Sequence, residues 1–213
     1  MSQETTGLKA ALSIPWMYEF IQTAVGAGKA RKIIAADYLK VRAGDHVIDV
    51  GCGTGEMIKS LPVGVRYVGF DLSEPYIRSA RSQFGAQGRF ECADVAYSRN
   101  LNLPAADVAY AIGLLHHLDD DQVVDLLRSL AEIIKPGGRV ITVDPTLFDG
   151  QNRVAAFVAK RDRGRNVRSP SEYAVLARSV FPYAKHEVRN DLLRIPYSHC
   201  IVEMIGAELS APA

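Results

Sequence analysis

The stretch "VIDVGCGTGE", residues 47–56, decides the fold, because a short apolar run breaks there into three glycines at alternate positions. In a doubly wound α/β sheet the first strand passes into the first helix through a glycine-rich turn, and ligands bind beyond the carboxyl ends of the strands. Glycine lets the backbone adopt positive φ and approach a ligand closely. The stretch therefore predicts a buried strand followed by a ligand-binding turn.

Apolar runs recur along the chain, and the segments between them have helical length. The runs cover residues 47–50, 67–70, 89–92, 108–112 and 140–143. Buried strands that alternate with helices indicate an α/β fold with a single Rossmann-like, doubly wound and mostly parallel sheet. Near the C-terminus two β-rich runs are joined by only a few residues, which favours an antiparallel last strand.

Two helices have readable ends. The segment "DDDQVVDLLRSLAEIIKPGG", residues 119–138, places apolar residues at helical spacing, with aspartates at its start. Lys135 is expected in its last turn, with Pro136-Gly137-Gly138 as a turn before the strand "RVITVD". A second helix is expected to begin at Ser73, whose hydroxyl caps the first amides, with Pro75 in the first turn.

Length and composition set the class of protein. The chain has 213 residues, 48% hydrophobic and 23% charged, with a net charge of +1. This balance predicts one domain over residues 1–213 and no nucleic-acid partner. Three cysteines without CxxC spacing indicate neither a metal site nor a disulfide framework, and we expect a reducing cytoplasm. No stretch has the apolar length of a membrane span, so no membrane partner is expected; a homodimer is left open.

The spacing of the glycine turn indicates which ligand it binds. A dinucleotide fingerprint is G-x-G-x-x-G, but here the third glycine comes one position early and Glu56 follows it. A carboxylate at a helix start disfavours a pyrophosphate. Asp71 ends the strand "YVGFD" and can accept from both ribose hydroxyls, while Asp94 follows the third strand and can accept from an exocyclic amine. The pattern favours a nucleoside cofactor without phosphates.

These motifs as a set resemble the class I S-adenosylmethionine-dependent methyltransferases. The resemblance rests on "VIDVGCGTGE", "VGFDLS", "ADV", "AIGLLHHLDD" and "IIKPGGRVITVD", and it covers about residues 45–144. It implies a seven-stranded sheet whose last strand is antiparallel, and S-adenosylmethionine as the cofactor. Asp71 would hold the ribose, Asp94 the adenine and Asp49 the ammonium, directly or through water. The other implied cofactor residues are Gly51, Cys52, Gly53, Gly55, Leu72 and Val95.

Segments outside the alternation are expected to cover the ligand. Residues 13–39 predict one or two N-terminal lid helices, and by resemblance to small-molecule methyltransferases Tyr18 contacts the cofactor. Residues 151–181 predict an acceptor-side helical insertion. Its part from Arg153 to Arg168 has six basic residues against one acid, which fits either a phosphate or carboxylate on the acceptor or a solvated helix face.

Two adjacent histidines follow the fourth strand. His116 and His117 change charge near neutral pH, so either suits a general base that removes a proton from the acceptor, with His116 slightly preferred. The alternative is structural: one ring packs under the sheet and the other bonds a backbone carbonyl.

Together these features predict a methyltransferase that moves a methyl group from S-adenosylmethionine to an oxygen, nitrogen or carbon of a small, biosynthetic metabolite that is anionic in one alternative. "AIGLLHHL" stands where an N/D-P-P-Y-type run would mark nucleic-acid base methylation. The rivals are a catalytically silent partner subunit that binds the cofactor, and a nicotinamide-dependent oxidoreductase.

Overall fold

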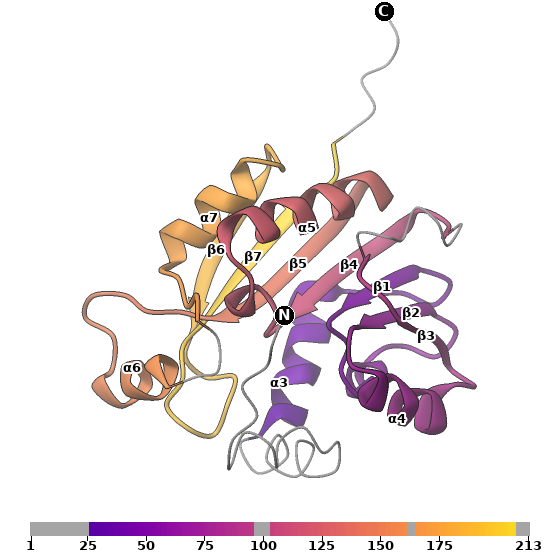
Figure 1. Ribbon diagram of the computed structural model, residues 1–213, viewed down its shortest axis with the longest axis horizontal. Coiled ribbons are helices and arrows are strands. Elements are labelled where there is room, and N and C mark those ends of the chain that lie inside the picture. The colour runs from indigo at the N-terminus through magenta and orange to yellow at the C-terminus, as the bar shows by residue number, and fades with distance from the viewer. Residues whose placement is uncertain (1–25, 96–102, 162–164, 208–213) are drawn as a thin grey trace, which may run out of the picture.

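A seven-stranded sheet organises the part of the chain that the structure, a computed structural model, describes: residues 26–95, 103–161 and 165–207. The strand order is β3-β2-β1-β4-β5-β7-β6 (Figure 1). β1 to β5 pair in parallel, while β7 runs antiparallel to both β5 and β6. The strands are β1 (His46–Val50), β2 (Arg66–Asp71), β3 (Gly88–Cys92), β4 (Ala106–Ile112), β5 (Ile134–Pro145), β6 (Ala184–Arg189) and β7 (His199–Ile205). The expected sheet and its antiparallel last strand are confirmed.

Helices cover both faces of this sheet. α5 (Asp120–Ile133) and α7 (Pro170–Arg178) bury apolar side chains on one face, in a core that includes Ile48, Val140 and Val202. α3 (Ala27–Ile33), its π-helical continuation η1 (Ile34–Leu39) and α4 (Glu74–Phe84) pack on the other face. This two-sided burial explains why the parallel strands are continuous apolar runs.

The two helix ends predicted from sequence differ in outcome. Asp119 caps α5 in a reciprocal capping box with Gln122, but α5 ends at Ile133 and Lys135 lies in β5. The prediction of Lys135 in the last turn was wrong, because Ile134 already pairs with Ala106 of β4. Pro136-Gly137-Gly138 is therefore part of the strand, beside a shift in the β4–β5 register.

Ser73 does precede α4, and proline lies in its first turn, as expected. Its hydroxyl, however, makes no capping bond, so that part of the prediction was wrong. Instead, the backbone N–H of Ser73 donates to Oδ1 of Asp71 at 2.8 Å. This bond ties the start of α4 to the end of β2.

The remaining elements lie toward the carboxyl ends of the parallel strands. The short helix η2 (Glu56–Ser60) follows β1, and η4 (Leu115–His117) follows β4. α6 (Arg153–Lys160) stands apart from the sheet at the left of Figure 1. The predicted lid is helical over residues 27–39, whereas residues 13–25 lie outside the described residues. No helix among the described residues has the length and apolarity needed to cross a membrane.

Candidate functional site

The glycine loop, residues 51–55, connects β1 to η2 at the carboxyl end of the sheet. All three glycines have positive φ: +73° at Gly51, +55° at Gly53 and +79° at Gly55. The N–H groups of Gly51 and Cys52 donate to the carbonyl of Phe70 at 2.8 and 2.9 Å, which holds the loop against the end of β2. The backbone conformation therefore requires glycine at each of these positions.

The surroundings of the three glycines differ. A Cβ at Gly55 would lie 2.7 Å from the Phe90 ring, and one at Gly51 would lie 3.3 Å from Leu114. A Cβ at Gly53 would have nothing within 4 Å. Gly55 and Gly51 thus serve close packing, whereas the loop is open above Gly53, where a ligand can approach the backbone.

Asp71 lies beside this opening. Its Oδ2 accepts from the N–H of Gly53 at 2.9 Å, and its Oδ1 accepts from the N–H of Ser73. Burial raises the pKa of this carboxyl, and backbone hydrogen bonds from Ser73, Gly53 and Leu72 oppose the shift. Each carboxylate oxygen has a second lone pair, so Asp71 retains the capacity to accept from a pair of ligand hydroxyls. The residues present therefore fit a nucleoside at this position.

Asp49 lies in β1, and its side chain is buried. Only 3% of the residue is exposed, and its Oδ2 accepts from the hydroxyls of Tyr67 at 2.6 Å and Tyr110 at 2.9 Å. Burial raises its pKa to about 7, while the two tyrosine hydrogen bonds oppose the shift. Neither tyrosine was predicted as a partner of Asp49; the signal for them is that each lies in a strand that pairs with β1.

The other predicted cofactor residues differ in how far their side chains are exposed. Leu72 is 62% exposed, Asp94 is exposed and Cys52 is half-buried, with burial raising the pKa of its thiol. Val95 is buried in the core, so its side chain serves packing. Tyr18 lies outside the described residues.

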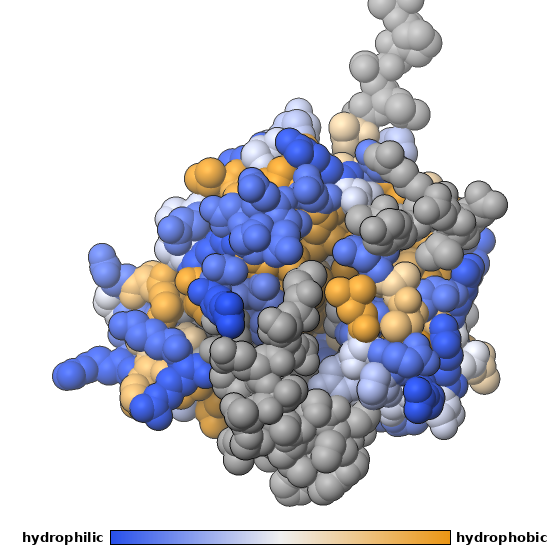
Figure 2. Space-filling view, viewed as in Figure 1, coloured by the Kyte–Doolittle hydropathy of each residue, from blue (hydrophilic) through white to orange (hydrophobic). Residues whose placement is uncertain are grey.

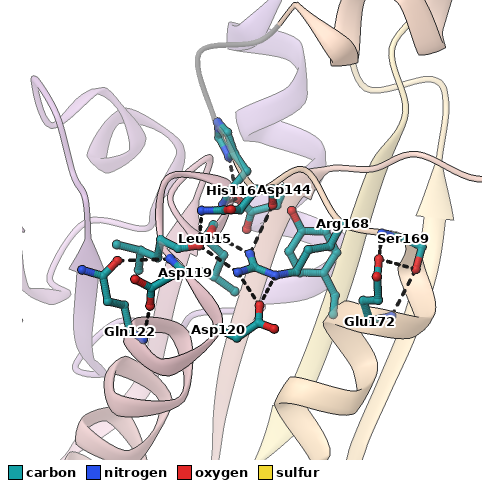
Figure 3. Close-up of polar contacts among 12 residues, drawn as sticks. Leu115, His116, Asp119, Asp120, Gln122, Asp144, Arg168, Ser169 and Glu172 are labelled. Carbon is teal, nitrogen blue, oxygen red and sulfur yellow. Dashed lines mark hydrogen bonds and ion pairs between the residues drawn. The ribbon is translucent and has the colours of Figure 1, made fainter. Parts of the chain in front are cut away.

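The two histidines lie in the histidine turn, residues 115–118, which follows β4. His116 is only 4% exposed, and its Nδ1 lies 2.8 Å from Oδ1 of Asp144 at the end of β5 (Figure 3). The same oxygen accepts from the backbone N–H of His116 at 3.2 Å. His117 is exposed, with its ring centroid 4.0 Å from that of His116. The structure therefore gives His116 a buried carboxylate as its partner, and the choice between a base and a structural role stays a prediction.

The tautomer of His116 follows from this contact. A carboxylate only accepts hydrogen bonds, so Nδ1 donates to Asp144, and in the neutral ring the lone pair is then on Nε2. Leu114, which precedes the turn, packs where a Cβ of Gly51 would lie. The histidine turn and the glycine loop are therefore neighbours at the carboxyl end of the sheet.

Arg168, the last residue of the basic segment, lies against the histidine turn (Figure 3). It is only 7% exposed, and its guanidinium forms an ion pair with Asp120 at 2.8 Å. The remaining basic side chains differ from it: Arg161 stacks on the ring of Phe157 at 4.2 Å, and Arg153, Lys160 and Arg165 are exposed. Figure 2 shows apolar and hydrophilic surface interleaved over α6. Arg163 lies outside the described residues.

No group of three or more potential metal ligands occurs within residues 26–95, 103–161 and 165–207. The three cysteines are free. Glu56, the first residue of η2, has its carboxylate 2.7 Å from Lys59 and 3.8 Å from Arg31. The side chain is therefore held by two cations at the position where a dinucleotide pyrophosphate would lie.

Comparison with known proteins agrees with this geometry. Residues 47–138 match the family described as "Methyltransferase domain". The O-methyltransferase resE of Aspergillus sclerotiorum is 32% identical over 112 residues, which are 50% of this chain and 42% of that protein. An uncharacterised methyltransferase of Mycobacterium bovis is 30% identical over 166 residues, which are 75% of this chain and 81% of that protein.

Solved structures share the fold. The plantazolicin methyltransferase BamL, in a complex with a desmethyl substrate analogue and S-adenosylhomocysteine, has a TM-score of 0.72 at 16% identity. The match covers 95% of this chain and 92% of that one. The chain spans less than half the length of the first curated relatives, 38 to 49% of each. By its sequence likeness to the mycobacterial protein, together with the motifs and the sheet, the chain belongs to the class I S-adenosylmethionine-dependent methyltransferase family.

Proposed function

We propose that this protein transfers a methyl group from S-adenosylmethionine to an oxygen, nitrogen or carbon of a small molecule. One observation carries the proposal: an open, glycine-lined loop with Asp71 beside it adjoins a buried histidine–carboxylate pair. The cofactor, when bound, supplies a methyl group on a positively charged sulfur that a nucleophile can attack. The chain must then hold two ligands in line and accept a proton.

The cofactor side of the site is assigned as follows. Asp71 accepts from the ribose hydroxyls through its remaining lone pairs, and Gly53 leaves room for the ligand against the backbone. Asp94 accepts from the adenine amine, and Asp49 lies behind the loop as the carboxylate nearest the amino-acid part. Gly51, Cys52, Gly55 and Leu72 complete the walls, whereas the side chain of Val95 packs in the core; Tyr18 belongs to the proposed lid.

His116 is the proposed base. Asp144 holds its Nδ1, which directs the Nε2 lone pair to the proton on the acceptor. His117 stacks on the outer side of this ring and is the second candidate. A base held by a buried carboxylate keeps one orientation, so proton removal needs no rearrangement at the moment of transfer.

The acceptor is proposed to be a small biosynthetic metabolite. Two observations support this: a relative by sequence is named as an O-methyltransferase and a solved structure with this fold as a plantazolicin methyltransferase, and the insertion over residues 151–181 is short. An acidic group on the acceptor would suit the exposed cations Arg153, Lys160, Arg161 and Arg165. We further propose a single domain, cytoplasmic location and no nucleic-acid or membrane partner; a homodimer is the assembly to test.

Isothermal titration calorimetry with S-adenosylhomocysteine tests the cofactor assignment, with NADH as the competing ligand. Asp71→Ala should weaken S-adenosylhomocysteine binding about 10- to 100-fold, because charge-assisted hydrogen bonds contribute about 1.5–3 kcal/mol. Asp125→Ala, which removes a 72% exposed carboxylate on α5, should not change it. Binding of NADH alone would instead support the oxidoreductase.

A screen of small phenolic, carboxylate and amine acceptors, read out as S-adenosylhomocysteine formed, tests the transfer itself. His116→Ala should lower turnover without changing S-adenosylhomocysteine affinity, and His117→Ala serves as the matched variant. Equal turnover in wild type and both variants would reject the base assignment. Tight S-adenosylhomocysteine binding with no transfer to any acceptor class would favour the silent partner subunit.

A further inference from the structure

Residues in the segment between α6 and α7 donate hydrogen bonds to backbone carbonyls of the histidine turn. The N–H of Asn166 donates to the carbonyl of His116 at 3.0 Å, and the Asn166 side-chain amide donates to the carbonyl of Leu118 at 3.0 Å. Arg168 donates to the carbonyls of Leu115 at 3.0 Å and Leu118 at 2.8 Å. Three carbonyls of a four-residue turn therefore accept bonds from two residues about 50 positions later.

The Arg168 guanidinium is saturated by these contacts. It has five N–H donors. Nε and one terminal nitrogen lie 2.9 and 2.8 Å from Oδ1 of Asp120, and the other bonds reach carbonyl oxygens of Leu115, Leu118 and Asn166. With four hydrogen bonds and the ion pair with Asp120 in place, the guanidinium does not serve an anionic group on the acceptor.

The backbone of Arg168 is fixed to the end of β5 as well. Its carbonyl accepts from the hydroxyl of Thr146 at 2.9 Å and from the N–H of Leu147 at 3.3 Å. Asp144, the partner of His116, lies two residues before Thr146 on the same strand end. Arg168 thus ties the turn that carries His116 to the strand end that carries Asp144.

This connection matters because, in the described part of the chain, only two backbone bonds form within the turn, from the N–H groups of His117 and Leu118 to the carbonyls three residues earlier. A three-residue 3-10 helix leaves its last carbonyls without intrahelical partners. Asp144 itself accepts from the His116 N–H at 3.2 Å, and Arg168 adds a planar group that holds two further carbonyls of the same turn in one geometry.

We propose that Arg168, assisted by Asn166, is a positioning residue that fixes the orientation of the His116 ring against Asp144. The assignment of a role in methyl transfer rests on the proposed function, in which His116 is the base. Arg168 itself touches no reacting atom; it acts through the backbone of the turn. Its substitution should change the ring environment of His116 before it changes the cofactor side.

Nuclear magnetic resonance of the histidine rings tests this without any acceptor. Nitrogen-detected long-range spectra of the full chain report which ring nitrogen carries the proton, and saturation transfer reports how fast that proton exchanges with water. The signals come from five histidines, and a His116→Gln spectrum assigns the one that matters. The variants are Arg168→Ala, Arg168→Lys and Asn166→Ala, with Arg128→Ala as the control, because Arg128 makes only an exposed pair with Asp125.

The expected result is a slowly exchanging proton on Nδ1 of His116 in wild type and in Arg128→Ala. Exchange should accelerate at least 10-fold in Arg168→Ala, somewhat less in Arg168→Lys, which keeps the charge but loses the planar fork, and least in Asn166→Ala. The dissociation constant for S-adenosylhomocysteine should stay within about threefold in each folded variant. If Arg168→Ala does not fold, proton exchange in Arg168→Lys and Asn166→Ala tests the proposal instead.

Folded Arg168→Ala or Arg168→Lys protein with wild-type ring signals would overturn the proposal. So would a loss of S-adenosylhomocysteine affinity as large as the change in ring exchange, since that would indicate general loosening of the fold. Failure of wild type to bind S-adenosylhomocysteine would count against the proposed function alone, because the ring comparison does not depend on the cofactor.

Discussion

The cofactor side and the acceptor side of this site are built differently. On the cofactor side, the loop and Asp71 come from consecutive strand–turn–helix units and lie 18 positions apart in sequence. On the acceptor side, the histidine turn is held by Arg168 from 50 to 53 positions away, and both groups of the turn that Arg168 holds are backbone carbonyls. A carbonyl is the same in every residue, so the accepting positions leave no trace in the sequence.

The largest predicted effect concerns the pH dependence of the cofactor side. Burial raises the pKa of Asp49 to about 7, above its unfolded value near 4, so the folded state binds the proton more tightly. The stabilisation is fully present below pH 4 and is lost as the pH rises through 7. Relative to Asp49→Asn, the wild-type free energy of unfolding should fall by up to about 4 kcal/mol over that range.

Urea unfolding of both proteins at several pH values measures this difference. Asp125→Asn, at an exposed carboxylate, is the control. Wild-type and Asp49→Asn stabilities that run parallel with pH would show that the carboxyl is not buried against Tyr67 and Tyr110 as described.

The next effect separates two glycines of one loop. Gly55→Ala places a Cβ 2.7 Å from the Phe90 ring at a φ of +79°, and should cost about 3 kcal/mol of stability through overpacking and strain. Gly53→Ala meets no neighbour and should cost about 1 kcal/mol from its φ alone. Thermal unfolding and calorimetry with S-adenosylhomocysteine should show that Gly53→Ala is folded but binds weakly. A Gly55→Ala protein more stable than Gly53→Ala would contradict the close packing of Gly55 against Phe90.

The smallest effect lies on the acceptor side. Ser169 caps α7 in a capping box with Glu172, and it directly follows Arg168. Ser169→Ala should cost about 1 kcal/mol, because an N-cap side chain satisfies one helix-end amide. Amide hydrogen exchange should rise in the first turn of α7 and remain at wild-type rates in the glycine loop. Faster exchange in both regions would mean that the two sides do not open separately.

Local patterns predicted the strands and the position of the glycine loop beside Asp71. Apolar runs gave five strands, and the G-x-G-x-G spacing with Asp71 at the next strand end placed the loop and its carboxylate together. The two tyrosine partners of Asp49 were not predicted, because an aromatic residue in a strand is equally expected to pack in the core. Tyr67 and Tyr110 come together because β2 and β4 lie on either side of β1, and this strand order cannot be predicted from any single segment.

On the acceptor side the sequence indicated the residues but not their roles. Arg168 was one of six cations in a basic segment, and nothing local distinguished it from Arg161 or Arg165. Only the fold separates a saturated, buried guanidinium from exposed ones. Similarly, Lys135 followed a helical pattern, and the competing β4 pairing that placed it in β5 lies elsewhere in the chain.

The position of β7 between β5 and β6 has a consequence for folding during synthesis. β5 and β6 have no direct pairing, so both wait for residues 199–205, which are made last among the strands. Until that strand leaves the ribosome, the side of β5 away from β4 offers unpaired backbone groups, and the apolar surface that Cys200, Val202 and Met204 later cover stays open. Among the strands that the structure describes, the edge of β5 is therefore left open to aggregation until β7 pairs with it.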